Sequence, residues 1–337
     1  SQGMDDSADS LAWAALPEPL PLHDARAALA SKVFTTVAGR STPRHRSIAE
    51  YLAAKALAKL IHQGLPLARV LALMQGFDGK PVEPMRGLLA WLVVHHRADR
   101  ARLLQLDPLG IVLNGDVAAL GRSERIDLLK ALGTAAKQNQ WFRKDAWVSH
   151  PFGPLATADM AETYEAVLTD TARDETHQAF IDCVFDALHH GEHMPSLQAP
   201  LEAWVADPLA TMGNRIAAYR AWQRHAPESI QASKQLTWLG DLHAGRVVDD
   251  EDRLTSVLLC DLYPRVVGPQ EIWTYLRSRR RQGAVPDLSN FWSYNLLRQS
   301  RPGDFAALAD AWLAADLSPN DDPYQFGLRR LKAELLL

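Results

Sequence analysis

Hydrophobic residues recur at three- and four-residue spacing in nearly every stretch of this chain longer than ten residues, which is the pattern of amphipathic helices. Strand-like sequence is confined to residues 33–37, which are rich in β-branched side chains and precede a turn-like segment over 38–43. A second short strand over 44–46 would complete a hairpin. We therefore expect a helix over 24–31, this hairpin, and a further helix, which is the order of elements at the end of a winged-helix unit.

The clearest helix start lies after the hairpin. Ser47 and Glu50 have the spacing of a capping box. In this motif the Ser oxygen accepts a hydrogen bond from an early helix amide, and the Glu carboxylate reaches back to the backbone amide of the cap. Gly64 stands where a left-handed residue ends a helix, and Pro66 can occupy the first position of the next one. The apolar stripe expected on the intervening helix consists of Ile48, Leu52, Ala56 and Leu60.

The remainder of the chain is a series of helices separated by Gly, Pro and Asp-Pro. Short loops make consecutive helices antiparallel neighbours, and so many helices cannot surround one core. We expect an all-α, degenerate HEAT-like array without a fixed-period consensus, divided into residues 1–63, 64–139 and 140–337, with a hinge over 140–156. The expected helices cover 66–75, 84–96, a short segment before Asp107, 123–139 with Ser123 as a cap, 159–168, 174–190, 209–224, 229–239, 250–263, 269–281, 288–299 and 303–315.

Composition narrows the function classes. The 36 Lys and Arg residues against 40 Asp and Glu residues give a formal charge of −4, which excludes a globally basic nucleic-acid binder. Two cysteines cannot form a disulfide framework and are typical of a reducing compartment. No apolar run reaches the roughly 18 to 20 residues of a membrane helix. We expect a cytoplasmic, globular protein that does not bind membranes.

The sequence lacks the common catalytic motifs. Gly79-Lys80 is the only Gly-Lys pair, but Met74 stands in place of the first P-loop glycine and Pro81 in place of the Ser or Thr. No dinucleotide fingerprint, nucleophile elbow or zincin motif occurs. We therefore expect no catalytic residue, and neither a nucleotide nor a metal cofactor, in this chain itself.

One segment has the composition of a metal site. Helical spacing would place Cys183, Asp186 and His190 on one face, with His177, His189 and His193 nearby. The favoured interpretation is a buried cysteine followed by histidines that decorate a polar helix end, where the helix dipole stabilises positive charge. The alternative is a metal-dependent hydrolase.

Two charge runs have structural interpretations. The acids at 249–252 lack the alternation and the central glycine of a calcium loop, and they suit the start of a helix. The basic run at 277–281 suits a helix end. Its alternative is a phosphate-binding patch in which Trp273 and Tyr275 stack on bases.

His45 stands between two arginines just before the expected helix, and the residues around it resemble a known family. The string F34-x10-H45-R-S-I-A-E-Y-L-A-A54 resembles the end of the winged-helix domain in NACHT-type STAND nucleotide switches. Further resemblances to bacterial members follow in order between about residues 20 and 315. They are the segments 86–92, 106–116, 125–132, 261–273 and 291–292.

This resemblance implies the helical sensor part of a modular ATPase. The nucleotide-binding core, with ATP or ADP and Mg²⁺, would lie before residue 1, because this chain lacks the P-loop and the Mg-binding acids. By resemblance, His45 would contact the phosphates of bound ADP in the full-length parent and keep the switch closed. The helical array would recognise a ligand, often a foreign protein, and many bacterial members of the family act in defence against phage.

The expected function is therefore a non-catalytic sensor and regulatory module that partners the parent's nucleotide-binding domain, in cis or in trans, and binds a protein ligand. The main alternative is a stand-alone helical scaffold that binds a protein or, less favoured, a nucleic acid.

Overall fold

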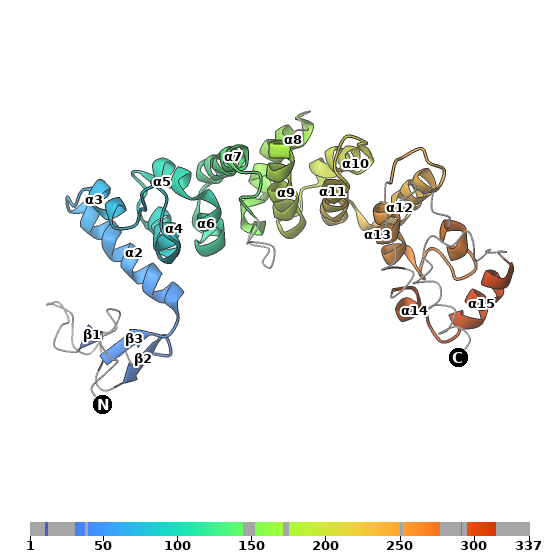
Figure 1. The fold of residues 1–337 in the computed structure, drawn as a ribbon, viewed down its shortest axis with the longest axis horizontal. Coiled ribbons are helices and arrows are strands. Elements are labelled where there is room, and N and C mark those ends of the chain that lie inside the picture. Colours follow the sequence, from blue (N-terminus) through green and yellow to red (C-terminus); the bar gives the residue numbers. More distant parts are fainter. Residues whose placement is uncertain are drawn as a thin grey trace. The chain divides into compact units, whose positions relative to one another are not determined.

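The computed structural model describes residues 11–12, 31–37, 40–143, 152–170, 175–249, 252–276, 291 and 295–314. The chain forms two compact units, Ser1–Leu155 and Ala156–Leu337. Within the described residues, each unit consists of antiparallel helices, and a short β-sheet precedes the helices of the first unit (Figure 1). The predicted fold class, an all-α helical-repeat array preceded by a hairpin, is confirmed.

The sheet is antiparallel, and its order is β1-β3-β2. Strand β2 spans Phe34–Val37, close to the prediction, whereas β3 spans Arg40–Pro43. The prediction of a second strand at 44–46 is therefore wrong. Val37 pairs with Arg40, so the returning strand is already complete at Pro43, which lies opposite Phe34. Strand β1 (Leu11–Ala12), which was not expected, pairs with the other edge of β3. The predicted helix over 24–31 lies outside the described residues, apart from Ser31.

Helix α2 (Arg46–His62) follows the sheet directly. It begins at Arg46 with His45 as its N-cap, so the predicted start at Ser47 is wrong. Gly64 adopts a φ of 108°, as expected of a left-handed residue after a helix. Pro66 is the N-cap of α3 (Leu67–Ala72), one position before the first helical residue.

The buried face of α2 is not the predicted stripe. Ala54 and Ala58 are the buried residues of this helix, and the small side chains allow close packing against α4 (Arg86–His95). Leu52 and Leu60 are 41% and 47% exposed. The larger apolar residues were predicted to be buried, but the alanines on the opposite side of α2 pack against α4, because their small side chains allow a close approach.

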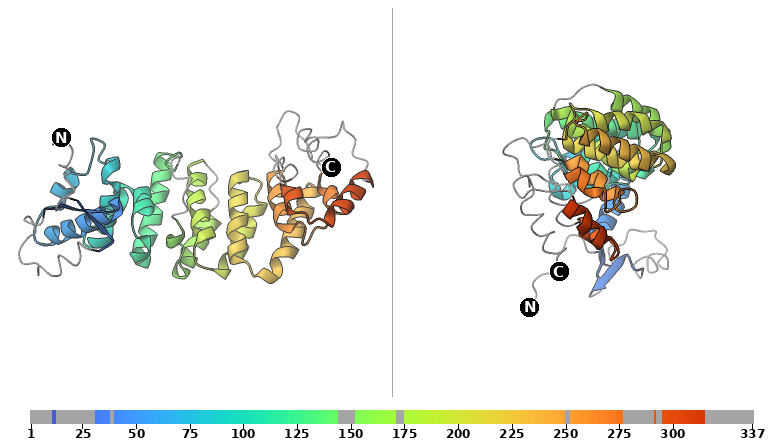
Figure 2. Two further views of the ribbon diagram at one scale, coloured as in Figure 1. Left: turned by 90° about the horizontal axis from the view of Figure 1, so that it is seen from below. Right: turned by 90° about the vertical axis from the view of Figure 1, so that its right-hand side faces the viewer.

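The rest of the first unit stacks in two layers. Helix α4 packs between α2 and α6 (Pro108–Asn114), while α5 (Arg100–Leu106) packs on α7 (Arg122–Gln138). Views of the ribbon from two sides show these helices side by side (Figure 2). Short 3₁₀ turns connect them: η2 (Glu83–Met85), η3 (Val117–Ala119) and η4 (Gly153–Leu155).

Helix α6 was not predicted, because Asp107-Pro108 was interpreted only as a break. The Asp107 side chain accepts a hydrogen bond from the Gly110 amide, and Pro108 occupies the first helical position, so the dipeptide begins a helix. The predicted cap at Ser123 is also wrong. Gly121 is the N-cap of α7, and its amide donates to the Glu124 carboxylate at 2.5 Å.

In the second unit, α11 (Met212–His225) packs against α9 (Glu175–His190), α10 (Gln198–Ala206) and α13 (Arg253–Leu262). Trp204 and Trp222 are among its fully buried side chains. The Trp204 indole donates to the Leu168 carbonyl at 2.7 Å, which ties α10 to the end of α8 (Ala161–Thr169). The other elements are η5 (Ala158–Met160), η6 (Pro195–Leu197), α12 (Glu228–His243), η7 (Ile272–Leu276), α14 (Leu296–Gln299) and α15 (Asp304–Ala314).

Two predictions in this unit need correction. Helix α10 was not predicted, and Pro200 lies in its first turn, where proline is tolerated. The predicted helix over 269–281 is a 3₁₀ turn, η7, in the residues that the structure describes there. Residues 277–281 lie outside the described part of the chain.

Candidate functional site

The hairpin meets α2 at His45, the only residue predicted to touch a ligand. His45 has extended backbone angles (φ −126°, ψ 141°), and its side chain makes no capping bond to the helix. His45 and Arg44 are both exposed. The Arg44 amide donates to the Val33 carbonyl at 2.8 Å, which fixes the backbone where the sheet ends. The junction therefore presents an imidazole and a guanidinium on backbone that the sheet and the helix hold from both sides.

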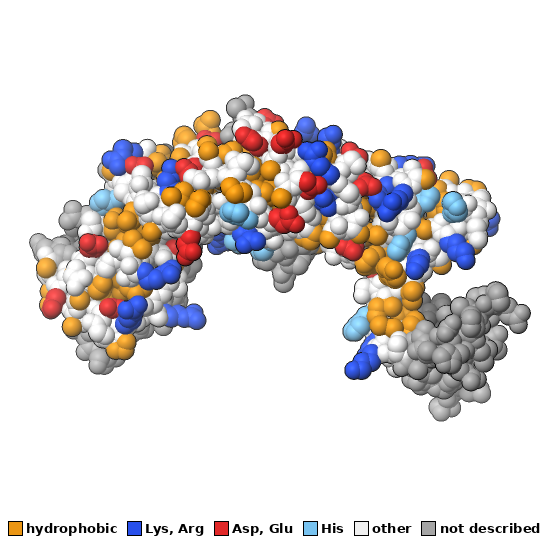
Figure 3. Space-filling model, turned by 180° about the vertical axis from the view of Figure 1, so that it is seen from behind, with side chains coloured by type: hydrophobic (Ala, Val, Ile, Leu, Met, Phe, Trp, Pro, Cys, Tyr) orange, Lys and Arg blue, Asp and Glu red, His pale blue; other side chains and the backbone are white. Residues whose placement is uncertain are grey.

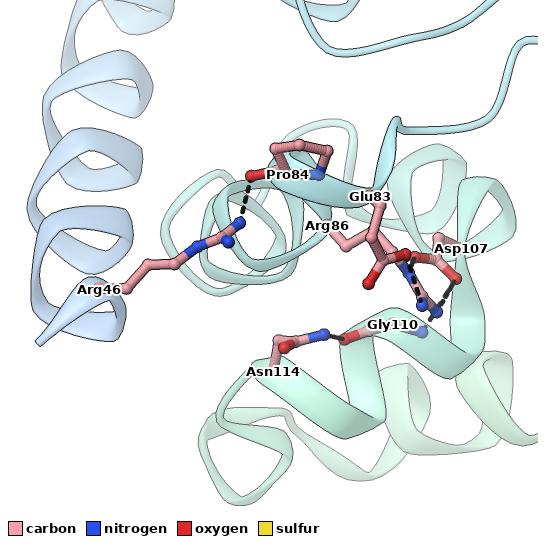
Figure 4. Close-up of polar contacts among 7 residues, drawn as sticks. All are labelled: Arg46, Glu83, Pro84, Arg86, Asp107, Gly110 and Asn114. Carbon is pink, nitrogen blue, oxygen red and sulfur yellow. Dashed lines mark hydrogen bonds and ion pairs between the residues drawn. The ribbon is translucent and has the colours of Figure 1, made fainter. Parts of the chain in front are cut away.

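Arg46 anchors this junction to the array (Figure 4). Its guanidinium donates to the Pro84 carbonyl at 2.5 Å and to Glu50 at 2.7 Å. The predicted capping box is wrong, because Arg46 binds the Glu50 carboxylate that would have reached back to the cap. That carboxylate also lies against α4, where a Cβ on Gly87 would come within 2.1 Å of it. Gly87 is therefore the residue that lets α2 and α4 approach at this point.

The contact continues from η2 into α6. Arg86 donates from Nε to Asp107 Oδ2 at 2.7 Å and from a terminal nitrogen to Oδ1 at 3.2 Å, and it also pairs with Glu83 at 3.2 Å. The bond to Asp107 raises the pKa of Arg86 above its already high ordinary value. Because Asp107 caps α6, this ion pair links the first turn of α4 to the first turn of α6 (Figure 4). Arg46 and Arg86 thus connect the junction to the array through hydrogen bonds to carboxylate and carbonyl oxygens.

A second exposed feature of the first unit is the turn between α3 and η2. The Phe77 side chain is fully exposed, and Leu73 is 77% exposed. The turn is ordered by its own hydrogen bonds: the Gly76 amide donates to the Lys80 carbonyl at 2.9 Å, and the Gln75 side chain donates to the Gly79 carbonyl at 2.5 Å. These bonds fix the turn, which therefore holds the phenylalanine ring in water.

The residues considered for zinc do not come together around a metal. Cys183 is buried, and its thiol faces the Ala179 carbonyl at 3.7 Å. His190 binds Asp186 at 3.1 Å on the same helix. His189 and His193 contact the Arg220 and Arg224 carbonyls of α11 at 3.1 and 2.9 Å. Among the described residues, no group of three or more His, Cys, Asp or Glu side chains could hold a metal ion.

His225 is a buried titratable residue that was not predicted from the sequence. It lies at the end of α11, is fully buried, and accepts a hydrogen bond from the Met194 amide at Nδ1, at 3.0 Å. Burial, and next the neighbouring His193 ring 6.1 Å away, lower the pKa of His225 to about 4. The signal was available, because Ala218, Ala221, Trp222 and His225 share one face at helical spacing and all four are buried.

The acidic run at 249–252 begins with Asp249, whose side chain binds the first turn of a helix. The Asp249 carboxylate accepts from the Thr255 amide at 2.8 Å and from the Leu254 amide at 3.2 Å, so it serves the first turn of α13. Burial raises the pKa of Asp249. Trp273 is buried, and its indole donates to the Leu308 carbonyl at 3.0 Å, so its ring is not available to stack on a base. The basic run at 277–281 lies outside the described residues.

Among the helices of the described ranges, none is both long and apolar enough to cross a bilayer. No protein-family model, curated protein or solved structure matches this chain.

Proposed function

We propose that this chain is a non-catalytic sensor and regulatory module of a NACHT-type STAND ATPase, with a protein as its ligand. The observation that carries the proposal is the junction at His45. An exposed imidazole stands at the first turn of α2, directly after the hairpin, in the local sequence that resembles the family. The parent's nucleotide-binding domain would supply ATP or ADP and Mg²⁺, in cis or in trans.

The chemistry of the junction suits a phosphate contact. An imidazole donates a hydrogen bond to a phosphate oxygen, and the amides at the start of a helix favour negative charge. Arg46 is already bound to Glu50 and to the Pro84 carbonyl. His45 and Arg44 are therefore the side chains with which the junction would meet a docked nucleotide, and Arg46 would transmit their position to η2, which leads into α4.

Regulation requires that the protein ligand bind the open arrangement more tightly than the closed one, because equal affinity for both would shift neither. Phe77 supports a protein ligand, since aromatic side chains on ordered turns are common anchors of protein interfaces. A phage protein in an antiviral role is the ligand that the resemblance favours. Nucleic acid is less favoured, because the chain carries a net charge of −4.

The test uses the domain encoded upstream in the same reading frame or by a neighbouring gene. We expect a P-loop domain there, and we expect it to bind this chain more tightly with ADP than without. His45→Ala should weaken binding in the presence of ADP by about tenfold, the value of one charge-assisted hydrogen bond. His62→Ala, an exposed histidine at the other end of α2, is the matched control and should change nothing. Equal effects of ADP on both variants and the original chain would contradict the proposal.

A stand-alone scaffold is the second candidate, and Phe77 supports it equally. The two differ in nucleotide dependence. Partner binding by the scaffold would be the same with ADP, with ATP and with no nucleotide, whereas a switch would change its affinity between these states.

A further inference from the structure

The side of α2 opposite the buried Ala54 and Ala58 carries an exposed apolar stripe. Leu52, Ala56 and Leu60 follow one another at four-residue spacing and are all exposed. Lys55 and Lys59 are exposed at one margin of this stripe, the margin at which burial, and next the charge of Lys55, lower the pKa of His95 on α4. We call these five residues the α2 outer face. From Leu52 to Leu60 the stripe extends for about 12 Å, or roughly two helical turns.

The segment of sequence that contains α2 carries a positive net charge. Residues 40–82 contain seven Lys or Arg residues and two acids, Glu50 and Asp78. Both acids already have partners: Glu50 binds Arg46, and Asp78 accepts from the Lys80 amide at 3.0 Å. Lys55 and Lys59 form no ion pair with a carboxylate of the described residues. Seen from behind, the part of the surface that the structure describes carries hydrophobic side chains interspersed with Lys and Arg (Figure 3).

We propose that the α2 outer face binds an acidic amphipathic helix of a protein partner. Apolar residues at four-residue spacing form the ridge that packs into the groove of a second helix. The lysines at one margin then call for Asp or Glu on the partner, which fixes its orientation and speeds its association. The inference rests on the proposed protein-binding role, but it requires neither His45 nor a nucleotide-binding domain.

Other occupants fit this face less well. Helices that lie on membranes bury a broad apolar face that contains Trp or Phe, and the α2 outer face has neither. Single-stranded nucleic acid needs aromatic rings for base stacking, which this face also lacks. A second copy of the chain has a matching charge, since residues 156–337 carry 26 acids against 17 basic residues. Self-association of the chain is therefore one of the outcomes that the experiment below distinguishes.

The test measures the binding of three labelled synthetic peptides to the full chain by fluorescence anisotropy at low ionic strength. Each peptide is about 18 residues long, which gives roughly five helical turns. The first has a leucine face flanked by Glu, the second has the same leucine face flanked by Lys, and the third is a scrambled version of the first. We expect the first peptide to bind and the other two to bind at least about tenfold more weakly.

Two double variants test whether the acidic peptide binds at the α2 outer face. Lys55→Glu with Lys59→Glu should weaken the acidic peptide at least about tenfold and favour the Lys-flanked one, and Leu52→Gln with Leu60→Gln should weaken both. Lys130→Glu with Lys137→Glu is the matched control. It makes the same change of charge at exposed positions of α7 and should alter binding less than about twofold. Circular dichroism verifies that each variant is folded.

Several results would overturn the inference. One is equal binding of the scrambled peptide, or an equal loss in the α7 control, since either indicates net charge alone. Another is absence of binding to all three peptides. Binding to phosphatidylserine vesicles instead of peptide would identify a membrane surface, and self-association in sedimentation velocity that Lys55→Glu with Lys59→Glu abolishes would identify a second copy. None of these results changes the expected effect of His45→Ala on ADP-dependent docking, so failures of the two proposals are distinguishable.

Discussion

The buried His225 makes the second unit sensitive to acid. In the folded protein its Nδ1 accepts a hydrogen bond from the Met194 amide, and burial is the main cause that lowers its pKa, followed by the neighbouring His193 and Arg224. Protonation would place an N–H donor against the Met194 N–H donor in a site without water contact. We therefore predict that stability falls as the pH drops below about 6.5, the ordinary pKa of histidine.

The sign and the size follow from linkage. The folded pKa of about 4 lies below the unfolded value of 6.5, so the unfolded chain binds more protons between these values. The stability that neutral His225 contributes is complete above pH 6.5 and is lost as the pH falls towards 4. At about 1.4 kcal/mol per pH unit, the gap amounts to about 3 kcal/mol, of which about 2 kcal/mol is already lost at pH 4.5.

The assay is urea unfolding at about pH 7 and about pH 4.5, followed by the fluorescence of buried tryptophans. His225→Asn keeps an acceptor near the position of Nδ1 but cannot titrate. This variant is expected to be less stable than the original chain at pH 7, because it leaves unfilled volume. Its further loss between the two pH values should be smaller by about 2 kcal/mol. His62→Asn is the control, because His62 is exposed on α2 and should leave the pH dependence unchanged.

Two results would refute this reasoning. The first is a histidine NMR titration that places the pKa of His225 near 6.5. The second is the same loss of stability between pH 7 and pH 4.5 in His225→Asn and in the original chain.

Three further changes have expected outcomes. Phe77→Ala should alter the free energy of unfolding by less than about 0.5 kcal/mol while it abolishes binding of the protein ligand; a large loss in urea unfolding would mean that the ring is packed. Asp107→Ala should lower the free energy of unfolding by about 2 to 3 kcal/mol, because α6 loses its cap and Arg86 loses its bidentate partner. Asp116→Ala is the control, because Asp116 is exposed in a turn. Trp204→Phe should cost about 1 to 2 kcal/mol in the same measurement through the lost bond to the Leu168 carbonyl, and an unchanged stability would contradict the importance of that bond.

The sequence predicted the helical class and the position of most helices, because their apolar periodicity is a property of the chain itself. It failed where a helix start depends on a distant partner. Glu50 has the right spacing for a capping box, but Arg46 binds it and is itself held by the Pro84 carbonyl 38 residues away. Asp107-Pro108 has the composition of a break, yet capping and the fixed φ of proline make it a helix start.

The candidate site was partly predictable. His45 was identified from the local string, whereas its exposure and the anchoring of the junction to α4 are tertiary facts. The outward position of Leu52 and Leu60 could not be predicted, because periodicity gives two apolar sides to α2 and only the packing of Ala54 and Ala58 against α4 decides between them. His225 has the helical spacing of a core residue, but its hydrogen bond from the Met194 amide and the nearby His193 ring are tertiary facts.

The retention of ADP by the full-length parent that we propose, once purified, tests the central claim most directly. Nucleotide released on denaturation is quantified by chromatography for the original protein, for His45→Ala and for His62→Ala. If His45 holds the closed state, the original protein and His62→Ala retain about one ADP per chain, and His45→Ala retains several-fold less and shows higher basal activity. Equal ADP content and equal basal activity in all three proteins would contradict the account.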